Sequence, residues 1–137
     1  PKPSSAASDV YKRQVNAIMN EALKYQGWEY VYGGASPTTS FDCSGLTQWC
    51  YGVAGITLPR TAQTQYDATR HIPFEDAQPG DLVFFNSGNS SKLATHVGIY
   101  LGNGQFVHAS TPSTGVIISD INSSYYSSTF VGARRLG

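Results

Sequence analysis

Phe41-Asp42-Cys43-Ser44-Gly45 places a cysteine at the start of a predicted helix. The apolar residues that follow keep a helical spacing: Leu46, Trp49, Cys50 and Val53. Glycines at 52 and 55 end the pattern, and Asp42 or Ser40 could cap its beginning. The unpaired amides and the positive dipole of a helix N-terminus stabilise a thiolate, so this position predicts a lowered pKa for Cys43.

The second cysteine, Cys50, lies seven residues further along the same predicted helix. That separation corresponds to about 10 Å along a helix, which is too far for a disulfide. Both thiols are therefore expected to be free, with Cys50 acting as a small buried apolar residue.

The rest of the chain predicts helices first and strands afterwards. A helix is expected from Val15 to about Gly27, and a short third helix follows Thr61, its candidate cap. Expected strands then follow at residues 82–85, 96–101, 105–109, 116–118 and 130–134. This order predicts an α+β domain over residues 15–137, preceded by a disordered lead-in, linker or translation artefact over residues 1–14.

Two of the predicted strands each carry a histidine, His96 and His108. A two-residue turn between these strands would put the two imidazoles on opposite faces of the sheet. A three-residue loop, residues 102–104, would set Gly98 opposite His108 and make His96 a diagonal neighbour on the same face. A thiol beside two imidazoles can act as a nucleophile with a base and a residue that orients the base. Such a set requires both histidines on one face of the sheet, so it predicts a loop with an odd number of residues.

Composition excludes several classes of function. The 137 residues suit one domain, and 9 basic side chains balance 9 acidic ones, so no basic field favours nucleic acid. No apolar run approaches the roughly 20 residues needed to span a bilayer. The N-terminus also lacks the pattern of a signal peptide, so export would require a segment not present in this chain.

Six short motifs carry a resemblance to one family. They are Tyr30-Val31-Tyr32-Gly33-Gly34, Asp42-Cys43-Ser44-Gly45, Leu58-Pro59-Arg60, Pro79-Gly80-Asp81-Leu82, His96-Val97-Gly98-Ile99-Tyr100 and Phe106-Val107-His108-Ala109-Ser110. In this order they resemble the successive motifs of NlpC/P60 cysteine peptidases. The resemblance runs from about residue 25 to residue 135, and its C-terminal part is similar to bacterial murein endopeptidases.

The resemblance implies a papain-like fold, with N-terminal helices packed on an antiparallel sheet, and hydrolysis of peptidoglycan stem peptides. The expected bond joins γ-D-glutamyl to meso-diaminopimelate or L-lysine. Cys43 would be the nucleophile, His96 the base and His108 its orienter. Tyr30 would assist the oxyanion hole. Asp42 and Ser44 would help to hold the amino end of the stem.

Three alternatives stay open on the sequence alone. Cys43, His96 and His108 could bind zinc, although no further ligand spacing supports this. The domain could also be a non-catalytic wall-binding module or a papain-like acyltransferase. The family resemblance implies a secreted or envelope protein without a cofactor, and a monomer is the default expectation.

Overall fold

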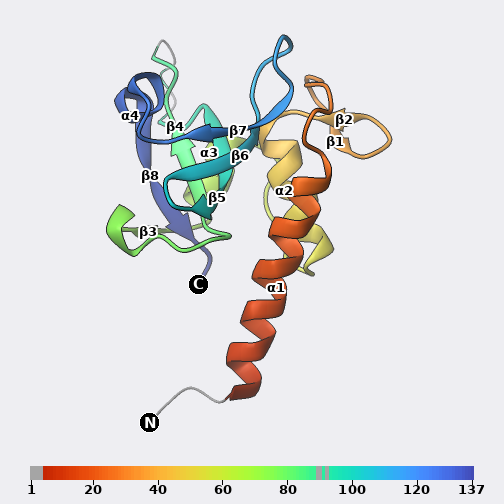
Figure 1. Cartoon of the computed structure of the whole chain (residues 1–137), viewed down its shortest axis with the longest axis vertical. Helices are drawn as coiled ribbons and strands as arrows, with labels where there is room; N and C mark the ends of the chain where they lie inside the picture. The colour runs from red at the N-terminus through yellow and green to blue at the C-terminus, as the bar shows by residue number, and fades with distance from the viewer. Residues whose placement is uncertain (1–4, 89–90, 92) are drawn as a thin grey trace.

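The chain folds into helices packed on an antiparallel sheet (Figure 1). The computed structural model describes residues 5–88, 91 and 93–137. Its elements, in chain order, are α1 (Ser5–Lys24), β1 (Ala35–Ser36), β2 (Ser40–Phe41), α2 (Cys43–Val53), α3 (Ala62–Asp67), β3 (Arg70–Ile72), the 3-10 helix η1 (Phe74–Asp76), β4 (Leu82–Phe85), β5 (His96–Gly102), β6 (Gln105–Ala109), β7 (Val116–Asp120), α4 (Ser124–Thr129) and β8 (Phe130–Arg135). The predicted α+β class is confirmed.

The N-terminal helix is longer than its apolar pattern predicts. α1 begins at Ser5 instead of Val15, and its first turns extend away from the body of the molecule (Figure 1). Residues 5–14, expected as a disordered lead-in, linker or artefact, are thus helical, while residues 1–4 lie outside the described part. Residues 5–14 contain no Gly or Pro and include Ala, Lys, Arg and Gln, which favour helix without burial. No helix in the described residues is long and apolar enough to cross a membrane.

The main sheet has six strands in the order β3-β8-β4-β5-β6-β7. β4 to β7 form the predicted meander, and β8 returns to lie between β3 and β4. At the edge of the sheet, His71 of β3 pairs with Arg134 of β8, and its side chain is exposed. β3 was not among the strands predicted from the sequence, because a three-residue strand is too short to show an alternating pattern.

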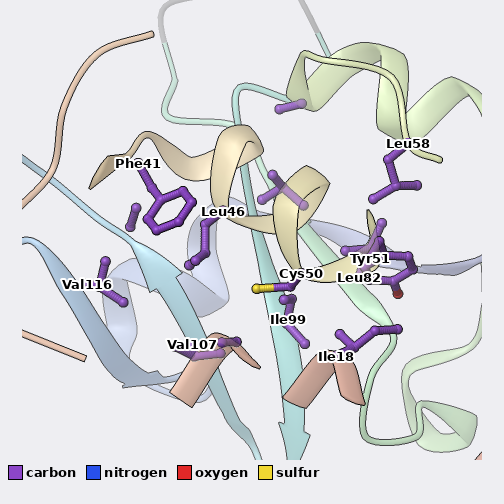
Figure 2. Packing of buried hydrophobic residues seen from close by; sticks show 14 of the residues in the cluster. Ile18, Phe41, Leu46, Cys50, Tyr51, Leu58, Leu82, Ile99, Val107 and Val116 are labelled. Carbon is purple, nitrogen blue, oxygen red and sulfur yellow. The ribbon is translucent and has the colours of Figure 1, made fainter. Parts of the chain in front are cut away.

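Both faces of the sheet are covered by apolar packing. Leu82 and Phe84 belong to a cluster with residues of α1 and α2, whereas Val83 and Phe85 belong to a separate cluster. Successive side chains of a strand point to opposite faces, so β4 is buried on both sides. Figure 2 shows the first cluster, with Cys50 of α2 close to Ile99 of β5. Cys50 is fully buried and, like Cys43, has a free thiol, as predicted.

A buried carboxylate, Glu21, anchors α1 to α2. It accepts hydrogen bonds from Lys24 Nζ at 2.8 Å, from Trp49 Nε1 at 3.0 Å and from the Tyr25 hydroxyl. Burial alone would raise the pKa of Glu21, but these three donors outweigh it and lower the pKa to about 2. The carboxylate is therefore ionised at neutral pH and fully bonded.

Strands β5 and β6 pair in the predicted register, but the loop that joins them is shorter than predicted. Ile99 pairs with Val107, as a three-residue loop would require. At the turn, however, Gly102 pairs with Gln105, which leaves a two-residue loop, and the register shifts beside Leu101. The odd residue is thus a β-bulge within the strand, so the predicted loop length is wrong.

The bulge keeps the two histidines on the same face of the sheet. With the register that Ile99 and Val107 set, Gly98 lies opposite His108, and His96 is a diagonal neighbour on the same face. A Cβ on Gly98 would lie 3.1 Å from His108 Cβ. The lack of a side chain at Gly98 therefore allows His108 to pack closely against β5.

Candidate functional site

α2 begins at Cys43 because the preceding residue caps it. Asp42 has an extended backbone, and its Oδ1 accepts the N–H of Gly45 at 2.7 Å. The other candidate cap, Ser40, instead donates its hydroxyl to the carbonyl oxygen of Glu29 at 2.6 Å. The cap places the thiol in the first turn of the helix, as the sequence predicted.

The Cys43 sulfur lies against the beginning of β5. The backbone N–H groups of Val97 and Ser44 donate towards it, and each favours the thiolate. Burial has the larger and opposite effect, so the pKa of the Cys43 thiol is raised above its ordinary value. The prediction of a lowered pKa is wrong, because the two amides do not compensate for the lost hydration and the charge of Asp42 also favours the neutral thiol.

The two histidines are hydrogen-bonded to each other. His96 Nε2 lies 2.6 Å from His108 Nδ1, and His108 Nε2 lies 2.8 Å from the Ser119 hydroxyl oxygen of β7. Val97, whose N–H donates towards the Cys43 sulfur, directly follows His96, so the thiol lies beside the end of β5 at which His96 stands. Nδ1 of His96 is the ring nitrogen that remains for exchange of a proton with the thiol.

Both imidazoles are neutral at physiological pH because of burial. The His108 side chain has no exposed surface, and its ring centre lies 4.3 Å from that of Phe106 and 5.4 Å from that of Tyr126. Burial lowers the pKa of His96 to about 4. Burial, and then the neighbouring His96, lower the pKa of His108 to about 2. A neutral imidazole is the form that can accept a proton from a thiol.

The zinc alternative finds no support in this geometry. Within the described part of the chain, no three His, Cys, Asp or Glu side chains are grouped to hold a metal ion. The facing nitrogens of His96 and His108 bond to each other at 2.6 Å instead of diverging around a shared ion.

Two cavities share the lining residue Thr95, one beside the thiol and the other beside the imidazole. The first, of about 530 Å³, is lined by residues that include Tyr30, Asp42, Cys43, Arg60 and Thr95. The second, of about 290 Å³, is lined by residues that include Phe85, Thr95, His96, Tyr125 and Tyr126. Thr95 lines both, so an extended ligand that occupied the two cavities would pass Cys43 and His96.

Tyr30 lies in the first cavity with its hydroxyl protonated. Burial, and then the charge of a Cys43 thiolate, raise the pKa of Tyr30 above its usual value. The hydroxyl is therefore a hydrogen-bond donor at neutral pH. Tyr32 lines the same cavity but is 91% exposed, so it stands at the rim.

Asp42 and Ser44 are joined to an arginine that the sequence analysis did not assign to the site. Arg60 donates to both carboxylate oxygens of Asp42, at 3.0 and 2.9 Å, and to the Ser44 hydroxyl at 2.9 Å. The second carboxylate oxygen also accepts the N–H of Gly33 at 3.0 Å. The predicted contact of Asp42 and Ser44 with a substrate stays a prediction, because both side chains are already bonded within the protein.

Two residues of the site, Arg60 and Ser119, were not assigned a role from the sequence. Arg60 belongs to the Leu58-Pro59-Arg60 motif, and its position in that motif was the available signal. Ser119 lies at the end of a strand without any local pattern that marks it. Its place beside His108 follows from the pairing of β6 with β7.

Comparison with known proteins identifies the family. The NlpC/P60 family model matches residues 27–135, a range that contains Cys43, both histidines and Ser119. The chain therefore belongs to the NlpC/P60 family, and the resemblance of its motifs is confirmed.

Relatives and solved structures agree with this assignment. The chain is 46% identical over 135 residues to the bifunctional muramidase/DL-endopeptidase CwlT of Bacillus subtilis, covering 98% of this chain and 39% of that protein. It is 36% identical over 140 residues to the murein DD-endopeptidase MepH of Escherichia coli, covering 97% of this chain and 51% of that protein. A structure from Staphylococcus aureus, described as similar to a lipoprotein of the NLP/P60 family, matches with a TM-score of 0.83 and 56% identity, over 90% of this chain and 41% of that one. The chain thus spans about half or less of each of these proteins.

Proposed function

We propose that this domain is a cysteine endopeptidase that hydrolyses peptidoglycan stem peptides. The bond to be cut joins γ-D-glutamyl to a diamino acid, either meso-diaminopimelate or L-lysine. Membership of the NlpC/P60 family supports the proposal, as does the DL-endopeptidase name of a relative that is 46% identical. The observation that carries it is the pair of cavities that share Thr95, one lined by Cys43 at the start of a helix and the other by His96 of the hydrogen-bonded pair His96–His108.

Cys43 and His96 would share one proton during the reaction. The thiol gives its proton to His96 Nδ1 while the sulfur attacks the γ-glutamyl carbonyl carbon. His96 returns that proton to the amine nitrogen of the diamino acid as the C–N bond breaks, which leaves a thioester on Cys43. Water then attacks the thioester, loses a proton to His96 and releases the carboxylic acid, and the sulfur recovers its proton from His96.

Burial favours a concerted transfer of this proton. The raised pKa of Cys43 and the lowered pKa of His96 both disfavour a separated thiolate and imidazolium before substrate binds. Negative charge would instead pass to the carbonyl oxygen during attack, where Tyr30 and a backbone N–H near Cys43 can donate to it. An oxyanion donor of this kind is typically worth about 3 kcal/mol of transition-state stabilisation.

The two cavities suit a peptide on both sides of the cut bond. The cavity beside Cys43 would hold the acyl side, with Arg60, Asp42 and Ser44 as a polar wall for the amino end of the stem. The cavity beside His96, walled by Tyr125 and Tyr126, would hold the diamino acid. Because this substrate lies outside the cell membrane, the proposed location is the bacterial envelope or the medium. A monomer without a cofactor suffices for this chemistry.

Mass spectrometry of muropeptides tests the proposal. Purified stems of both types are incubated with the wild-type domain and with Cys43→Ala, after each is shown to be folded. The matched control is Cys50→Ala on the same helix, which removes a buried core thiol and should lower stability without stopping cleavage.

Fragments cut after D-glutamate, produced by wild type and Cys50→Ala but not by Cys43→Ala, would support the assignment and reveal the stem preference. Cleavage only at a D,D cross-link would reject the proposed bond while keeping the chemistry. A folded wild-type domain that cleaves neither stem would overturn the proposal in favour of a wall-binding module or a papain-like acyltransferase.

A further inference from the structure

The last member of the hydrogen-bonded row that begins at His96 is a serine outside the predicted catalytic set. We propose that Ser119 is a positioning residue: its hydroxyl accepts a hydrogen bond from His108 Nε2–H and thereby keeps His96 Nδ1 free of a proton, ready for the Cys43 thiol. This inference rests on the proposed function, because that function gives His96 the role of base.

The register of the sheet brings Ser119 to this place. In the β6–β7 ladder, Ile117 pairs with His108 and Ser119 pairs with Phe106. Ser119 is thus a diagonal neighbour of His108 on the same face, and its Oγ lies 2.8 Å from His108 Nε2. Because the His108 side chain is fully buried, this nitrogen needs a partner within the protein, and Ser119 supplies it.

Two proton arrangements fit the distances, and they have opposite consequences. In the first, His96 Nε2–H donates to His108 Nδ1, so the proton of neutral His108 is on Nε2 and is donated to Ser119. His96 Nδ1 then carries a lone pair. In the second, His108 Nδ1–H donates to His96 Nε2, and the proton of neutral His96 must be on Nδ1. Only the first arrangement allows His96 to accept a proton from the thiol.

Loss of the Ser119 hydroxyl would shift this balance. Without an acceptor, the first arrangement leaves a buried N–H of His108 unpaired, which is costly. The second arrangement leaves only an unprotonated His108 Nε2 without a partner, so it becomes the arrangement of lower free energy. The serine hydroxyl would therefore act on the Cys43–His96 pair through His108, without contact with the reacting atoms.

Nitrogen-15 NMR of the histidine rings provides the direct test, because ring nitrogens with and without a proton have distinct shifts. Spectra are recorded near neutral pH for wild type, Ser119→Ala and Ser119→Thr, which retains a hydroxyl. The exposed Ser123, whose side chain makes no capping hydrogen bond, provides the control Ser123→Ala. His71 lies on β3, away from the pair in the strand order, and serves as an internal reference.

Wild type and Ser123→Ala should show His96 and His108 both protonated on Nε2, and Ser119→Ala should move both protons towards Nδ1. Muropeptide hydrolysis by Ser119→Ala should fall about tenfold or more in kcat with little change in KM, because Ser119 lines neither cavity. Ser119→Thr should recover most of kcat and the wild-type shifts.

A wild-type spectrum with His108 protonated on Nδ1 would overturn the inference, and it would do so even if Ser119→Ala failed to fold. A folded Ser119→Ala with wild-type tautomers and kcat would also overturn it. The spectra need no turnover, so a domain that hydrolyses nothing would refute the proposed function while the tautomer result stands separately.

Discussion

Replacing Asp42 by asparagine should destabilise the fold by about 2 to 3 kcal/mol, although the two side chains have nearly the same shape. Oδ1 accepts from Gly45 N at 2.7 Å, and Oδ2 accepts from Gly33 N at 3.0 Å and from Arg60 Nη2 at 2.9 Å. An asparagine that keeps its oxygen in the capping position must point its NH₂ group at two donors.

The magnitude follows from the bonds that this change removes. The backbone bond from Gly33 is worth about 1 kcal/mol, and the charge-assisted bond from Arg60 is worth about 1.5 to 3 kcal/mol. The Arg60 side chain is 36% exposed, so water recovers part of the second contribution and the lower end of that range applies. Asp42→Ala also removes the helix cap and should cost about 1 kcal/mol more.

Urea unfolding at one pH measures the effect, with the slope m confirming that the unfolding transition has not changed. The control is Asp67→Asn, an exposed aspartate that accepts a hydrogen bond from Gln63 and should change stability by less than about 0.5 kcal/mol. If Asp42→Asn were as stable as this control, the carboxylate would not be holding Gly33 and Arg60, and the reasoning would be refuted.

Three further predictions concern the sheet, the histidine pair and the buried acid. Gly98→Ala should cost about 1 to 3 kcal/mol in urea unfolding and lower hydrolysis, because the new Cβ would meet Phe106 Cδ2 at 2.7 Å; unchanged stability and activity would contradict the tight packing. His108→Ala should reduce kcat less than His96→Ala, since an orienter is more replaceable than a base, and equal losses would argue against these roles. Glu21 has a pKa of about 2 in the folded protein against an ordinary value of 4.5, so its carboxylate stabilises the fold at pH values above 4.5. This contribution is lost as the pH falls through about 2. Glu21→Gln should therefore lower stability at neutral pH and flatten its decline between pH 4.5 and 2; a decline as steep as in wild type would contradict this.

Much of the local structure could be predicted from the spacing of apolar residues and from the residues that cap or end helices and strands. The helical spacing after Cys43 and the Asp42 cap correctly placed the thiol in the first turn of α2. The alternation of side chains along β5 and β6 correctly put His96 and His108 on one face, although the extra residue lies in a bulge and not in the loop. α1 was missed before Val15 because its first turns rely on helix propensity and keep Val10 and Tyr11 each 46% exposed, so they leave no apolar stripe.

By itself, the sequence determined the family, the class of fold and the three residues of the candidate catalytic set, because spacing and motif order are local properties of the chain. The tertiary structure decided which groups complete the site. Arg60 reaches Asp42 from 18 residues away, and Ser119 reaches His108 across a strand pair. It also reversed the expected pKa shift of Cys43, since the helix dipole is a local property whereas burial depends on what the rest of the chain packs around the thiol.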